Sequence, residues 1–67
     1  MEPIYDGLSE EQRDAARAYA AEHRLAFETY PAGDDTVRFT VRLLPGDEGA
    51  PQWTGAHIDA VEALLRA

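Results

Sequence analysis

The strongest constraint on the fold is an alternating stretch of nine residues near the middle of the chain. Within residues 36–44, apolar side chains occupy every second position, and these are Val37, Phe39, Val41 and Leu43. This two-residue period is typical of a strand that buries one face and exposes the other. Proline and glycine are absent until Pro45, which stops the run. We therefore expect a strand over residues 36–44, and we expect the other segments to cover its apolar face.

A shorter alternation over residues 25–30 indicates the partner strand. The five residues that follow it contain Pro, Gly and two Asp, which favour a turn. An antiparallel hairpin with this turn places Phe27 opposite Phe39 on the apolar side. The same register places Glu28 opposite Arg38 on the other side, where opposite charges attract. The outer face of the sheet is expected to carry Glu28, Tyr30, Arg38, Thr40 and Arg42.

Helical spacing appears on both sides of the hairpin. We expect a first helix over residues 9–23, capped by Ser9, with Gln12 completing a capping box. Its buried stripe consists of Ala15, Ala16, Tyr19 and Ala20. We expect a second helix over residues 54–66, capped by its first residue, a threonine. Its apolar stripe consists of Ile58, Val61, Leu64 and Leu65. Trp53 precedes this cap and is expected to be a lid on the core.

The predicted fold is a single α+β domain over residues 1–67 with the order αββα. Both helices are expected on one face of the antiparallel hairpin. Two strands alone are marginally stable, which leaves three alternatives. The N-terminal arm, residues 1–8, adds a short edge strand through Ile4 and Tyr5, or an exposed edge pairs with another chain, or helix packing suffices.

The composition favours a small soluble protein. The chain has 67 residues, no Cys, and a net charge of −7 from thirteen acidic and six basic residues. A chain of this length buries only about 60% of the surface that its unfolded form exposes. The lack of Cys excludes disulfides and thiolate metal sites and suits a reducing compartment. No apolar run approaches the roughly 18 residues of a membrane span, and no signal-peptide pattern begins the chain. We therefore expect a cytoplasmic location.

The residue types that catalysis needs are nearly absent. Ser9 is the only serine, and its predicted capping role competes with a nucleophilic one. His23 and His57 are the only imidazoles, and neither has a compact carboxylate cluster beside it in the sequence. The acidic pairs at 34–35 and 47–48 lack the ligand spacing of a calcium loop. We therefore expect no enzymatic activity, no metal and no cofactor.

Acidic residues gather at the start and in the last third of the chain. Their charge disfavours direct binding to nucleic acid or to an anionic membrane, which both need basic side chains. If both helices cover one sheet face, the two acidic regions join into one negative surface. Carboxylates roughly 6 Å apart at helical spacing can mimic a row of phosphates. The alternative is a solvated face that only keeps the protein soluble. The predicted partner-binding residues are Glu10, Glu11, Asp14, Asp47, Glu48, Asp59 and Glu62.

In size, acidity, lack of Cys and lack of a catalytic constellation, the chain resembles, as a type, the small phage-encoded anti-CRISPR proteins. Some of those proteins are acidic and block nucleic-acid binding by an effector complex. No sequence motif carries this resemblance, and it assigns no residue. It implies a cofactor-free inhibitor whose protein partner has a basic groove, as a CRISPR effector complex has, in a bacterial host cell. The alternative is a structural or assembly module that forms a homodimer through the open hairpin edge or through Tyr30.

Overall fold

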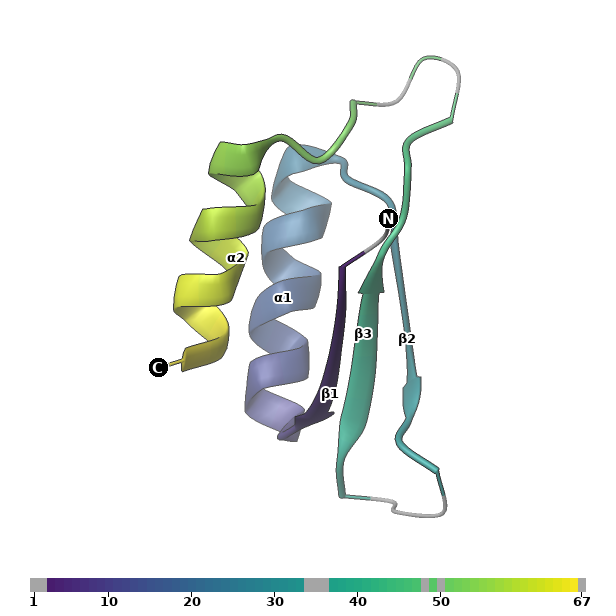
Figure 1. Cartoon of the computed structure of the whole chain (residues 1–67), viewed down its shortest axis with the longest axis vertical. Helices are drawn as coiled ribbons and strands as arrows, with labels where there is room; N and C mark the ends of the chain where they lie inside the picture. Colours follow the sequence, from purple (N-terminus) through teal and green to yellow (C-terminus); the bar gives the residue numbers. More distant parts are fainter. Residues whose placement is uncertain (1–2, 34–36, 48, 50, 67) are drawn as a thin grey trace.

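The computed structural model describes residues 3–33, 37–47, 49 and 51–66. Five elements follow one another in the chain: β1 (Ile4–Leu8), α1 (Glu10–His23), β2 (Phe27–Pro31), β3 (Phe39–Leu43) and α2 (Gly55–Arg66). The strands form one antiparallel sheet in the order β1-β3-β2, and both helices lie on the same side of it (Figure 1). The α+β class is therefore correct, whereas the expected four-element order is replaced by β-α-β-β-α.

The N-terminal segment forms the third strand of the sheet. β1 pairs with β3, which places Ile4 opposite Arg42 and Leu8 opposite Phe39. The register shifts between Tyr5 and Leu8, and Gly7 within this irregularity has a φ of 70°. Glycine adopts this conformation without the steric cost that a Cβ atom imposes. β1 and β2 are both antiparallel to β3, so they are parallel to each other, and α1 connects them as in a split β-α-β unit.

The hairpin register differs from the predicted one by four residues. Phe27 lies opposite Leu43, and Glu28 lies opposite Arg42. The predicted register was wrong because the connection is longer than five residues. β2 extends through Pro31, β3 begins only at Phe39, and Val37 is 69% exposed. Thr36, the predicted start of the strand, lies outside the described residues. A shift by an even number keeps each side chain on its predicted face.

The core lies between the sheet and the two helices. It contains Leu8 from β1, Ala16 from α1, Val41 and Leu43 from β3, and Val61 and Leu65 from α2. The buried alanines of α1 lack bulky side chains, so this helix packs directly on the sheet. Leu64 was predicted to be in the apolar stripe but is 39% exposed, because α2 turns its Val61 and Leu65 side inward. Trp53 packs against the core as expected, and its indole N–H donates to the Ala26 carbonyl at 2.7 Å.

One residue of the outer sheet face is buried, against expectation. Thr40 was predicted to face water but is only 3% exposed. β3 is the central strand, so β1 and β2 flank this residue on both sides. The Thr40 hydroxyl donates to the Asp6 carboxylate of β1, which satisfies its hydrogen-bonding capacity. The third strand therefore removes this threonine from solvent.

Hydrogen bonds at the helix ends hold the two helices in register. Ser9 caps α1, its hydroxyl accepts from the Gln12 backbone N–H at 3.1 Å, and the Gln12 Oε1 accepts from the Ser9 N–H at 2.8 Å. The Gln12 Nε2 also donates to the Leu65 carbonyl in the last turn of α2. The helices therefore run antiparallel, as Figure 1 shows. Neither helix of the described chain is long and apolar enough to cross a membrane.

Candidate functional site

Several of the predicted acidic residues are exposed and unpaired. Glu10 and Glu11 occupy the first turn of α1, where carboxylates interact favourably with the helix dipole. Asp59 is exposed on α2, and Asp47 is exposed in the loop between β3 and α2. Glu48 lies outside the described residues. Within the described part of the chain, Glu10, Glu11 and Asp59 have no ion-pair partner. These three carboxylates are therefore available to an external cation.

Asp14 differs from them because two arginines of α1 surround it. Its carboxylate lies 2.8 Å from the Arg13 Nε and 3.8 Å from an Arg17 Nη. The Arg13 guanidinium also covers the ring of Phe39 at 4.2 Å from the ring centroid, a cation–π contact between α1 and β3. Asp14 therefore orients a structural arginine, and its charge is partly neutralised.

Glu62 is also engaged within the fold. Its carboxylate accepts a 2.8 Å hydrogen bond from the Tyr5 hydroxyl, and it lies 3.8 Å from an Arg66 Nη. Burial of the phenol, then the hydrogen bond and the negative charge of Glu62, raise the pKa of Tyr5 to about 12. This contact joins β1 to α2. Glu62 therefore contributes to the fold more than to the free negative surface.

The helices bring some of the acidic residues together and separate others. The hydrogen bond from Gln12 to Leu65 places the start of α1 beside the end of α2. Glu10 and Glu11 consequently lie at one end of the helical layer, whereas the loop that contains Asp47 lies at the opposite end (Figure 1). The predicted residues thus spread along the helical layer and do not form one compact cluster.

The charge of the two layers differs. The helices carry six acidic side chains, Glu10, Glu11, Asp14, Glu22, Asp59 and Glu62, against the three basic side chains Arg13, Arg17 and Arg66, a net charge of −3. Within the strands, Asp6 and Glu28 stand against Arg42, while Arg38 directly precedes β3 and Arg24 directly follows α1. The Glu28 carboxylate lies 3.3 Å from an Arg42 Nη, and the Asp6 carboxylate accepts from Thr40. Among the residues that the structure describes, most of the negative charge that has no ion-pair or hydrogen-bond partner therefore lies on the helical layer.

A cluster of aromatic and imidazole rings, which sequence reasoning missed, joins the end of α1 to the start of α2. The rings of His23 and His57 have centroids 5.3 Å apart, and Tyr19 lies 4.4 Å from His23 and 6.2 Å from Trp53. His57 completes a capping box. Its ring Nδ1 accepts from the Thr54 backbone N–H at 3.3 Å, and its own backbone N–H donates to the Thr54 hydroxyl at 3.2 Å. Only the antiparallel packing of the helices reveals this proximity.

This ring cluster is poorly suited to hold a metal ion. A metal bound at either ring nitrogen of His57 competes with its role in the cap, because Nδ1 can accept from Thr54 only while the proton sits on Nε2. No group of three or more His, Cys, Asp or Glu side chains gathers anywhere in the described part of the chain. We therefore interpret the imidazoles as helix-packing and capping residues.

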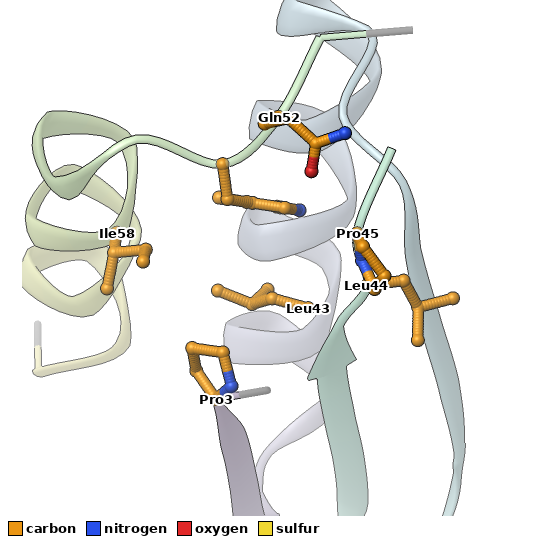
Figure 2. A pocket seen from close by; sticks show the side chains of 7 residues that line it. Pro3, Leu43, Leu44, Pro45, Gln52 and Ile58 are labelled. Atoms are coloured by element: carbon orange, nitrogen blue, oxygen red, sulfur yellow. The ribbon is translucent and has the colours of Figure 1, made fainter. Parts of the chain in front are cut away.

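An apolar pocket was also missed by sequence reasoning. It lies where the end of β3, the following loop and the start of α2 meet, and we call it the β3–α2 pocket (Figure 2). Its volume is about 380 Å³. Its lining consists of Pro3, Leu43, Leu44, Pro45, Gln52, Trp53 and Ile58. The lining residues lie at or close to Pro3 and Pro45 in the sequence, or more than five positions after Pro45, and only the fold shows that they border one open pocket.

Comparison of the chain with models of protein families, with curated proteins and with solved structures found no match. The candidate function therefore depends on the site geometry alone.

Proposed function

We propose that this protein is a cofactor-free binding protein whose helical layer docks on a basic surface of another protein. In this proposal it acts as an inhibitor of the anti-CRISPR type, occupying a groove that otherwise holds nucleic acid. One observation supports the proposal above others. Carboxylates of the sheet layer have partners in Thr40 and Arg42, whereas Glu10, Glu11 and Asp59 on the helices have none within the described chain.

Unpaired carboxylates on a rigid helix pair suit electrostatic recognition. Exposed charges steer association with an oppositely charged partner and make the association rate depend strongly on salt. Because water hydrates them in the free protein, they incur a desolvation cost only on binding. The capping boxes define the start of each helix, and the hydrogen bond from Gln12 to Leu65 joins the two helices. The layer therefore presents its charges in a preorganised arrangement, which lowers the entropic cost of binding.

The test is displacement of labelled duplex DNA from a panel of purified CRISPR effector complexes and other proteins with basic grooves. We expect displacement that weakens as salt is added. The double substitution Glu11→Gln and Asp59→Asn should weaken it. The matched control, Asp6→Asn and Glu28→Gln, removes the same charge from the sheet side and should change it little. Equal effects of the two double substitutions, or no displacement from any panel member, would contradict the proposal.

A second candidate function, homodimerisation, is favoured by the free edge of β2. The Leu44 and Ala32 N–H groups donate to Ala26 and Arg38 across the hairpin, so in this alternating ladder Thr29 directs its backbone groups away from β3. Such an edge can pair with a second copy. Light scattering over a range of concentrations tests this candidate. The wild type should form a dimer as its concentration rises, and Thr29→Pro should abolish the dimer without removing a hydrogen bond of the hairpin. A concentration-independent monomer would exclude it.

A further inference from the structure

We infer that the β3–α2 pocket binds one apolar side chain of a basic protein partner. Its volume of about 380 Å³ is near the lower limit of ligand sites, which span roughly 300–1,000 Å³. This space suits a single large apolar side chain better than an extended cofactor. Trp53 and Ile58 are half-buried, so each retains surface that a partner would remove from water. Figure 2 shows that Pro3, Leu43 and Ile58 border the pocket, whereas the Leu44 side chain points away from them.

Several polar groups of the pocket wall already have partners within the chain. The Gln52 side-chain amide accepts from the Gly46 N–H at 3.0 Å and donates to the Gly46 carbonyl at 2.9 Å. The Trp53 N–H donates to Ala26, and the Pro3 carbonyl accepts from the Leu43 N–H at 3.0 Å. An occupant consequently gains burial of apolar surface and few hydrogen bonds. Since a polar group would lose its water without compensation there, the occupant is apolar.

The charges beside the pocket indicate the chemistry of the occupant's neighbours. Among the described residues close in sequence to Leu43, Pro45 and Ile58, the charged ones are Asp47, Asp59 and Arg42, and Arg42 already lies 3.3 Å from the Glu28 carboxylate. Asp47 and Asp59 are exposed, and each lies within two residues of a lining residue. An apolar side chain flanked by Lys or Arg therefore complements both the wall and its surroundings. Only this choice of a basic partner rests on the proposed function, whereas the apolar occupant follows from the pocket itself.

Trp53 provides the readout because it is the only tryptophan in the chain and lines the pocket. The probes are three acetylated, amidated pentapeptides: Lys-Lys-Phe-Lys-Lys, its Ala analogue with Ala at the centre, and Glu-Glu-Phe-Glu-Glu. We expect the first peptide to change the Trp53 fluorescence saturably. The Ala analogue should bind about 10- to 100-fold more weakly, which corresponds to the loss of one buried large apolar side chain.

Two variants locate the binding site on the protein. Ile58→Ala removes part of the pocket wall and should weaken binding of the Phe peptide. Leu64→Ala shortens an exposed leucine in the second half of α2, outside the pocket, and should leave binding unchanged. Circular dichroism verifies that both variants fold.

The outcomes separate this inference from the proposed function. Equal affinity for the Phe and Ala peptides, or equal effects of Ile58→Ala and Leu64→Ala, would overturn the pocket assignment, yet charge-driven docking of the helical layer would stand. Equal affinity for the lysine and glutamate peptides would overturn the basic partner, and with it the proposed function. A Phe-dependent, lysine-dependent signal that Ile58→Ala weakens would support both.

Discussion

The side chain of Gln12 contacts the ends of both helices, so one isosteric substitution tests the packing of the helical layer. Its Oε1 accepts from the Ser9 N–H at 2.8 Å, and its Nε2 donates to the Leu65 carbonyl. Gln12→Glu replaces the NH₂ group with an oxygen and leaves the shape of the side chain almost unchanged. The capping box persists, because a carboxylate also accepts from Ser9. The bond to Leu65 is lost.

The expected cost follows from the lost donor. A hydrogen bond contributes about 0.5–1.5 kcal/mol, and a buried group left without a partner costs about 1–3 kcal/mol. This contact is only half-buried, so we expect Gln12→Glu to lower the free energy of unfolding by about 1–2 kcal/mol at neutral pH. The interactions of the new negative charge with the two helix dipoles nearly cancel, because this charge lies at the favourable start of α1 and at the unfavourable end of α2. For a domain of this size, each kcal/mol lowers Tm by about 4–8 °C.

Acidification should reverse the effect. A protonated carboxyl group is a donor again and restores the bond to Leu65, so the introduced acid favours its neutral form in the folded state. Its folded pKa is therefore raised, and the stability it contributes is present below the unfolded value of about 4.3 and lost as pH rises through the folded value. The difference between Gln12→Glu and the wild type should therefore shrink as pH falls through the folded pKa towards about 4.3, and it should stay small below that pH.

The assay is urea unfolding followed by Trp53 fluorescence at neutral and acidic pH. The control is Glu11→Gln, which changes the charge of the same helical turn at an exposed side chain without an ion-pair partner among the described residues, and it should shift stability by less than about 0.5 kcal/mol. A Gln12→Glu variant as stable as the wild type at neutral pH would refute the reasoning. So would a difference that persists unchanged on acidification.

Two further predictions concern single contacts and backbone conformations. Gly7→Ala should destabilise the protein by about 1–2 kcal/mol, because φ is 70° there while an added Cβ meets no atom within 4 Å. The matched Gly55→Ala, in α2 and equally uncrowded, should be stabilising by about 0.5–1 kcal/mol, and thermal unfolding that ranks the two variants in the opposite order would contradict this. Tyr5→Phe removes the phenol whose pKa is raised from 10.0 to about 12, so the wild type should lose a stability contribution between pH 10 and 12 that the variant lacks. Tyrosinate absorbance recorded against pH measures the ionisation of the tyrosines, and the step near pH 12 should disappear in Tyr5→Phe. If this step survives in the variant, Tyr5 is not its source.

The candidate surfaces were only partly predictable from the sequence. The exposed positions of Glu10 and Glu11 follow from the capping box, which is a local pattern. The ion pairs of Asp14 with Arg13 and Arg17 are local and follow from helical spacing. The hydrogen bond from Tyr5 to Glu62 was not indicated, because these residues are 57 positions apart. Likewise, the β3–α2 pocket and the ring cluster combine segments whose distance depends on how the helices pack. Such contacts have no periodicity in the sequence.

The sequence by itself determined the local elements, because backbone geometry sets their periods. Alternation at two residues marked β3, and Ser9 with Gln12 marked the start of α1. Only the tertiary structure decided that the arm at Ile4–Leu8 is a strand, since Gly7 interrupts its alternation at a bulge and pairing with β3 supplies the missing stability. It also decided the hairpin register and the burial of Thr40. Those features depend on the length of the connection and on which strand lies at the centre of the sheet, and both are settled when distant segments pack together.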